Sequence, residues 1–232
     1  MFSQNKEAED LQRIFSSIGV RTRYFVEFGF GARQNNTLHF ALKYRASGLY
    51  MDASRKQCLA AKLFWAFVPW KVRVKQTWID RANVDALISE ERTGEIDLLS
   101  LDVDGNDYWL WQAIHCVSPR VIVVEYNASF GAERAVTVPY DPLFDRDKKH
   151  PTGFYHGMSL QVAAKLGRSK GYSLVKCDDC GVNAFFVQDN ELKGLPAVDP
   201  HDAYLPHSNR LSRGYGQEAQ QEIVYSLPVV DV

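Results

Sequence analysis

The 232-residue sequence has few cysteines and almost no net charge. Its four cysteines are too few and too scattered for a disulfide framework, and the single Cys-x-x-C pair, Cys177 and Cys180, lacks the further ligands that a zinc site needs. The net charge is -1, so no general basic field would attract the phosphates of a nucleic acid. These absences exclude a disulfide-bonded scaffold and disfavour nucleic acid as a substrate.

The sequence also lacks a long hydrophobic run. Its longest apolar stretch, residues 59–70, is interrupted by Lys62 and Pro69 and is much shorter than the roughly 20 residues that cross a bilayer. The first ten residues lack the basic-then-apolar order of a secretory signal. We therefore expect no membrane segment, no membrane partner and a cytoplasmic location.

What the sequence does contain is an alternation of strand and helix patterns. Apolar and β-branched runs predict strands, and apolar residues at helical spacing predict helices between them. The strands are expected at 24–29, 48–54, 72–79, 96–102, 120–126, 172–176 and 183–187, and the helices at 7–18, 36–45, 55–64, 84–92, 108–116 and 159–170. This order predicts an α/β, Rossmann-like fold with a doubly wound, mostly parallel seven-stranded sheet and an antiparallel closing strand.

The chain is long enough for one full-sized α/β domain, flanked by shorter segments. Residues 1–23 are expected to form a capping helix, and residues 24–190 the main domain. Within that domain, residues 128–157 lose the periodic pattern and contain several prolines, which indicates a functional lid loop. Residues 191–232 are poor in periodic apolar positions and are expected to form an extended tail or a partner-binding arm.

A glycine turn follows the first predicted strand. Gly29, Phe30 and Gly31 would let a ligand approach the backbone closely, as nucleotide- and nucleoside-binding turns do. A dinucleotide fingerprint would need a third glycine at position 34, where Arg33 and Gln34 would instead crowd a pyrophosphate. The turn therefore disfavours a nicotinamide cofactor.

Two acidic residues lie beside this turn. Glu27 stands just before the glycines, where it would repel a diphosphate but accept a hydrogen bond from the ammonium of a methionyl group. Asp52 ends the second predicted strand, the position from which a carboxylate accepts both ribose hydroxyls. This combination favours S-adenosylmethionine as the cofactor.

The densest polar cluster follows a central strand. Asp102, Asp104, Asn106 and Asp107 lie at its carboxyl end, where open α/β sheets bind ligands. One or two of these acids are expected to act only in the turn and the helix N-cap. Asp102, however, ends an apolar strand, where an unpaired carboxylate would be costly, so it needs a partner.

The next strand offers such a partner, because it ends in Glu125 and Asn127. In a parallel sheet either side chain could face Asp102 across the same edge of the sheet. Oxygen ligands gathered in this way suit Mg²⁺ or a similar hard cation. Asp102, Glu125 and Asn127 are therefore the predicted metal ligands.

Four segments of the chain together resemble the FkbM-like methyltransferases: residues 27–31 (EFGFG), 102–109 (DVDGNDYW), 124–127 (VEYN) and 181–187 (GVNAFFV). The likeness extends over residues 24–188. It implies a class I methyltransferase fold, S-adenosylmethionine as methyl donor, and transfer to a hydroxyl oxygen of a small metabolite such as a sugar, a polyketide or another natural product.

Methyl transfer of this kind needs an aligned acceptor that loses a proton near the moment of attack. A metal held by Asp102, Glu125 and Asn127 would lower the pKa of the acceptor hydroxyl. Alternatively, Asp104 or His156 acts as a general base, since a histidine titrates near neutrality.

The acceptor site is expected to involve Asn106, Asp107, Tyr126 and Tyr140, the last held in a loop that flanking prolines stiffen. The expected partner is thus a small-molecule acceptor, and the sequence allows a homodimer. Two rival functions stay open: a Rossmann-type oxidoreductase or epimerase, and a degenerate methyltransferase fold that serves as a binding or assembly module.

Overall fold

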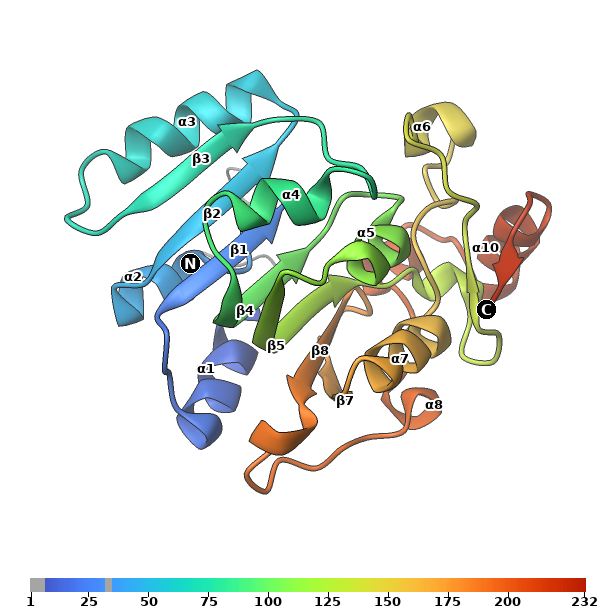
Figure 1. Ribbon diagram of the computed structural model, residues 1–232. Helices are drawn as coiled ribbons and strands as arrows, with labels where there is room; N and C mark the ends of the chain where they lie inside the picture. Colours follow the sequence, from blue (N-terminus) through green and yellow to red (C-terminus); the bar gives the residue numbers. More distant parts are fainter. Residues whose placement is uncertain (1–6, 32–34) are drawn as a thin grey trace.

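The computed structural model of the chain describes residues 7–31 and 35–232. Seven strands form one sheet in the order β3-β2-β1-β4-β5-β8-β7 (Figure 1). Strands β1 to β5 pair in parallel, and β8 runs antiparallel between β5 and β7. The strands span β1 Tyr24–Phe28, β2 Ser47–Asp52, β3 Val72–Gln76, β4 Gly94–Leu101, β5 Val117–Glu125, β7 Tyr172–Cys177 and β8 Asn183–Gln188. The predicted fold class, including its antiparallel strand, is confirmed.

Helices cover both faces of this sheet, which explains why its central strands are apolar on both sides. One cluster of buried side chains joins the sheet to α4, α5 and α7, and a second joins its other face to α1, α2 and α3 (Figure 1). The helices span α1 Glu7–Ile18, α2 Leu38–Tyr44, α3 Arg55–Trp65, α4 Val84–Ser89, α5 Asp107–Ala113 and α7 Leu160–Ser169. The predicted helix at 7–18 is confirmed, since the structure has the same bounds.

The order of the strands determines where a ligand can bind. Strand β1 lies between β2 and β4. Strands β2 and β3 are therefore on one side of β1, and the strands that follow them in the chain are on the other side. Ligands of open α/β sheets bind at this switch point, beyond the carboxyl ends of the strands. Strands β1, β2, β4 and β5 end at Phe28, Asp52, Leu101 and Glu125. The residues that follow these ends therefore meet at one edge of the sheet.

Residues 128–157, called the lid segment below, pack against the C-terminal part of the chain. It contains η1 Ala128–Phe130, β6 Val136–Thr137 and α6 Arg146–Lys149, while residues after β8 form η2 Asp189–Glu191, α8 Pro200–Ala203, α9 Ser208–Ser212, α10 Gln217–Tyr225 and β9 Val230–Asp231. Strand β6 pairs antiparallel with β9, and Val136, Phe154 and Val224 share a buried cluster. The expectation of an extended tail is thus wrong, because residues 191–232 fold back onto the lid segment.

No helix within residues 7–31 and 35–232 is both long and apolar enough to cross a membrane. Arg33 and Gln34, which the sequence placed against a pyrophosphate, lie outside the described residues.

Candidate functional site

Two pockets lie at the carboxyl edge of the sheet and share a wall. The first, the glycine-loop pocket, has a volume of about 340 Å³ and is bordered by the turn after β1 and the end of β2. The second, the polar pocket, has a volume of about 300 Å³ and extends toward the lid segment and α9. Gly29, Asp102 and Asp104 border both pockets. Two ligands bound in the two pockets would therefore lie next to each other at these three residues.

The wall between the pockets depends on Gly29. Its backbone has φ of +68°, and a Cβ atom built there would lie 1.5 Å from the carbonyl oxygen of Asp102. No side chain fits in this space, so the turn after β1 can lie directly against the end of β4 only with glycine. Phe30 and Gly31 continue the turn along the glycine-loop pocket. All three residues of the predicted glycine turn thus border this pocket.

The far side of the glycine-loop pocket carries Asp52 and an apolar surface. Asp52 accepts a hydrogen bond from the backbone N–H of Ser54 at 2.5 Å, and burial together with the nearby Asp104 raises the pKa of its carboxyl. Trp78 borders the same pocket and donates from Nε1 to the carbonyl oxygen of Pro142 at 2.8 Å, which ties this wall to the lid segment. A carboxylate beside an apolar wall suits a nucleoside, with its hydroxyls at the acid and its flat base against the wall.

Glu27 is almost fully buried and borders the polar pocket. It accepts hydrogen bonds from the backbone N–H groups of Asn36 (2.9 Å) and Thr37 (3.2 Å) and from the Thr37 hydroxyl (2.5 Å). Burial outweighs these donors and raises the pKa of the carboxyl to about 7. Glu27 therefore fastens the start of α2 to the end of β1.

This raised pKa gives the first prediction. The pKa of Glu27 is about 7 in the folded chain and ordinarily 4.5, so the protonated carboxyl stabilises the folded state. This stabilisation is complete below pH 4.5 and is lost as the pH rises to about 7. The loss amounts to at most about 3 kcal/mol. Urea unfolding of wild type and Glu27→Gln across this range measures it, since the variant has no such proton. The same pH dependence in both proteins would contradict the prediction.

Asp102 and Glu125 form a pair of acids at the bottom of the polar pocket. Burial raises the pKa of both carboxyls well above their ordinary values, and the charges of neighbouring acids raise them further, that of Asp102 acting on Glu125 among them. Two acids that raise each other's pKa do not both ionise readily. Oε2 of Glu125 is buried and has no hydrogen-bond partner among the described residues. The predicted need of Asp102 for a partner is therefore met by Glu125.

Asp104 differs from this pair because it is half-exposed and makes an ion pair with Arg146 of α6. Its backbone is in the left-handed region, with φ of 55°. Arg146, Arg210 and Arg213, from the lid segment and the C-terminal segment, border the polar pocket opposite the acids of the sheet edge. The pocket thus offers charges of both signs, which favours a polar ligand over an apolar one.

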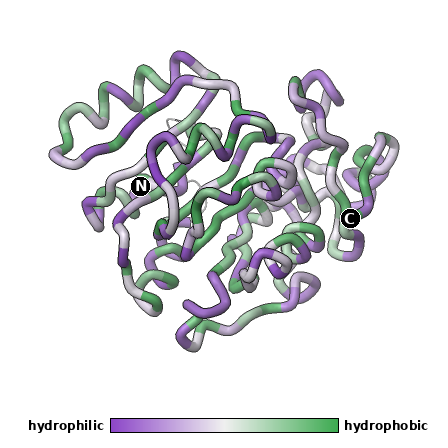
Figure 2. The backbone as a smooth tube through the Cα atoms, in the orientation of Figure 1, coloured by the Kyte–Doolittle hydropathy of each residue, from purple (hydrophilic) through white to green (hydrophobic). Residues whose placement is uncertain are grey.

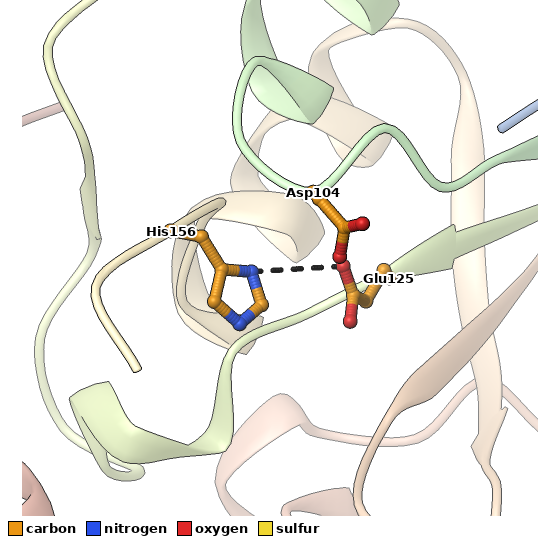
Figure 3. A group of neighbouring side chains, drawn as sticks. All are labelled: Asp104, Glu125 and His156. Carbon is orange, nitrogen blue, oxygen red and sulfur yellow. Dashed lines mark ion pairs between the residues drawn. The ribbon is translucent and has the colours of Figure 1, made fainter. Parts of the chain in front are cut away.

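His156 lies behind Glu125 and is fully buried. Its Nδ1 is 3.6 Å from Glu125 Oε2, and Figure 3 shows the ring turned toward Glu125, with Asp104 beside it. Its Nε2 lies 2.9 Å from Nη2 of Arg210, and a guanidinium can only donate, so Nε2 accepts and the proton is on Nδ1. Burial and the charges of Arg210 and Arg146 lower the pKa of His156 well below its ordinary value, so the ring is neutral.

Arg210 is the main site residue that the sequence analysis missed. It is almost fully buried, and its Nη1 donates to Asn127 Oδ1 at 2.8 Å and to the Ser129 hydroxyl at 2.5 Å. Asn127 in turn donates to the carbonyl oxygens of Phe154 and His156. No sequence signal pointed to Arg210, because it lies in a segment without helical periodicity and meets the site only through the fold.

Several predicted acceptor residues have structural roles instead. Asp107 accepts from the backbone N–H groups of Val103 (2.8 Å) and Gly105 (3.0 Å), which closes the turn before α5. Tyr126 donates to the carbonyl oxygen of Leu205, and Tyr140 packs on Arg81. Neither pocket is bordered by Asp107, Tyr126 or Tyr140, whereas Asn106 borders the glycine-loop pocket.

The predicted metal site can be tested against this geometry. Among the His, Cys, Asp and Glu side chains that the structure describes, those of Asp104, Glu125 and His156 bring ligand atoms within 4.8 Å of one another. A metal on His156 would need a free electron pair on Nδ1, but the hydrogen bond from Arg210 leaves the proton there. Asn127 Oδ1 already accepts two hydrogen bonds. These residues therefore do not fit a divalent cation.

A second prediction follows from this misfit. Turnover should be unchanged in excess EDTA, and added Mg²⁺ should not raise Tm, because no ligand set is available without breaking the hydrogen bond between Arg210 and His156. Turnover assays and thermal melts with and without chelator check this. Loss of turnover in EDTA that Mg²⁺ restores would show that a metal binds despite the geometry.

Comparison with known proteins adds evidence on the fold. No family model and no curated protein matches the sequence. Among solved structures, the chain is similar to a "putative caffeoyl-CoA O-methyltransferase" from Staphylococcus aureus, with a TM-score of 0.50, 11% identity, and coverage of 81% of this chain and 85% of that one. It is also similar to an S-adenosylmethionine-dependent methyltransferase from Clostridium acetobutylicum, with a TM-score of 0.49, 10% identity, and coverage of 79% and 92%. Together with the strand order, the first likeness shows the Rossmann-like fold of methyltransferases.

Proposed function

We propose that this protein is an S-adenosylmethionine-dependent methyltransferase that methylates a hydroxyl group of a small polar molecule. The observation that carries the proposal is the junction of two pockets at Gly29, Asp102 and Asp104. One pocket suits a nucleoside, and the other brings a pair of buried acids to the same junction. Methyl transfer needs this arrangement, with donor and acceptor side by side.

The cofactor would lie in the glycine-loop pocket. Gly29 provides the space for close backbone approach, Asp52 would accept from the ribose hydroxyls, and the apolar wall with Trp78 would pack on the adenine ring. Glu27, in the polar pocket on the other side of Gly29, would face the cationic methionyl end. Bound there, S-adenosylmethionine would supply an activated methyl group.

The acceptor would lie in the polar pocket, which Asp102 and Glu125 border. A hydroxyl bound there would donate a hydrogen bond to a carboxylate oxygen of this pair, and the proton that it loses would pass to the Asp102–Glu125 pair. A base with a raised pKa suits that step near neutral pH, because it holds the proton it receives. His156 borders neither pocket, and its Nδ1 lies 3.6 Å from Glu125 Oε2, so His156 acts here as a positioning residue rather than as the base.

We further propose the FkbM-like enzymes as the subfamily, since all four segments that carry the resemblance contribute residues to the polar pocket. Residues 27–31, 102–109, 124–127 and 181–187 supply Glu27, Gly29, Asp102, Asp104, Glu125, Val182 and Asn183. Sugars and polyketides, the acceptors that this resemblance implies, are polar molecules with hydroxyl groups, as the polar pocket requires.

Ligand-induced stabilisation tests the proposal. S-adenosylmethionine or S-adenosylhomocysteine at a hundred times its Kd should stabilise the protein by about 2.7 kcal/mol, which raises Tm by roughly 5–10 °C for a chain of this size. Asp52→Asn should weaken this shift. NADH is the control ligand and should leave Tm unchanged. If neither methyl donor nor product shifts Tm, the chain is instead a binding module with a methyltransferase fold.

A further inference from the structure

Helix α3 exposes large apolar side chains to solvent. Leu59, Leu63 and Phe64 are 57%, 60% and 47% exposed, and Phe67, in the turn that follows the helix, is 89% exposed. In Figure 1 this helix lies at the border of the molecule beside β3, the last strand of the sheet, far from the lid segment and α10. Figure 2 shows apolar and polar stretches alternating along it.

The exposed side chains are not part of the protein core. Helix α3 buries Cys58 and Trp65 against the sheet. Leu59 and Leu63 are spaced by four residues, so they lie next to each other on the exposed side of the helix, and Phe67 is exposed in the turn beyond its end. The helix therefore has two apolar faces, and the structure uses only one of them.

The segment that contains α3 and β3 is also strongly basic. From Ala53 to Ile79 the sequence contains six lysines and arginines and no acidic residue. Two of the six, Arg73 and Lys75, make ion pairs with Glu91 and Glu90 of the segment at the end of α4. The other four make no ion pair with any residue that the structure describes: Arg55, Lys56, Lys62 and Lys71. We call these four, with Leu59, Leu63, Phe64 and Phe67, the α3 surface.

We propose that the α3 surface binds to the surface of a bilayer that contains anionic phospholipids. A helix that lies in the membrane interface needs apolar side chains to enter the acyl boundary and basic side chains around them to meet the headgroups. The α3 surface has both. This proposal does not rest on the proposed methyl transfer, because none of its residues borders either pocket.

Charge argues against a second copy of the chain as the occupant. A twofold dimer places the same patch on both subunits, so four unpaired cations would face four others. An anionic lipid surface instead supplies the missing countercharge. The proposal revises the expectation of no membrane partner, which considered only the length needed to cross a bilayer and not a helix lying on its surface.

Vesicle sedimentation tests the proposal with the full chain. At low salt the protein should pellet with vesicles of phosphatidylcholine and phosphatidylglycerol but not with pure phosphatidylcholine, and 1 M salt should release it, since the screening length is then about 3 Å. Lys56→Ala with Lys62→Ala should weaken binding about 25-fold, at about fivefold for each charge. Phe67→Ser should weaken it about tenfold or more. Leu143→Ser, an exposed leucine on another surface, is the matched control and should bind like wild type.

Three results would overturn the proposal. The first is a failure of the wild type to pellet with phosphatidylglycerol vesicles, and the second is equal pelleting by the wild type and the α3 variants. The third is a dimer in sedimentation velocity that Phe67→Ser converts to a monomer, which would make the α3 surface a subunit interface. All substituted side chains are exposed, so circular dichroism should show an unchanged fold.

Discussion

The Asp102→Asn variant is expected to lose between about 10² and 10⁴ in kcat, the usual contribution of a general base. The substitution keeps the shape of the side chain but removes the ionisable group beside both pockets. Because burial raises the pKa of both Asp102 and Glu125 and the charge of Asp102 raises that of Glu125 further, Glu125→Gln should lose a similar factor. Formation of S-adenosylhomocysteine with any acceptor that the wild type methylates measures both losses.

The double variant distinguishes a shared proton from two independent acids. If the pair acts as one base, Asp102→Asn with Glu125→Gln should be about as slow as either single variant, because residues that act as a unit are not additive. Binding of S-adenosylmethionine should persist in all three. Asp189→Asn, an exposed acid outside both pockets, serves as the control. Two losses that multiply, or a single variant with wild-type kcat, would argue against the shared base.

The sequence predicts the fold well because the fold depends on patterns that burial imposes everywhere along the chain. The run Val121–Val124 in β5 is continuous and apolar since helices cover both faces of that strand. Helix α1 buries Leu11, Ile14, Phe15 and Ile18 at the spacing that the sequence shows. The short helices of residues 191–232 contain too few apolar residues for a helical period to be visible in the sequence.

The same logic explains which site residues could be predicted. Asp52 and Glu125 end their strands, Gly29 and Asp102 directly follow theirs, and a parallel sheet brings such ends to one edge whatever the loops do. Arg210 lies far along the chain from its hydrogen-bond partners, His156 being 54 positions away and Ser129 81 positions away. Its place depends on how α9 packs, which no local pattern encodes.

Polar residues within the family-like segments gave the least reliable assignments. Asn127 and Asp107 lie beside the strand ends, but both are buried, and a buried amide or carboxylate is costly unless it is hydrogen-bonded. Asn127 therefore holds the lid segment and Arg210, and Asp107 holds the turn before α5. The sequence shows which polar side chains lie near the edge, whereas their contacts decide which ones still have an atom to offer a ligand.

The Gly29→Ala variant is expected to lose S-adenosylmethionine binding, because the added Cβ would lie 1.5 Å from the Asp102 carbonyl oxygen and would push the turn away from β4. Gly94→Ala is its matched control: Gly94 has a similar φ of +76°, but nothing lies within 4 Å of the added atom. Strain alone should cost each variant about 1–2 kcal/mol. Urea unfolding measures how much stability each variant loses. Calorimetric titration with S-adenosylhomocysteine measures the affinity for the ligand, so the two measurements together distinguish backbone strain from loss of the close contact. Equal destabilisation of both variants, with wild-type affinity for the ligand at Gly29→Ala, would mean that the close contact of β1 and β4 has no part in binding.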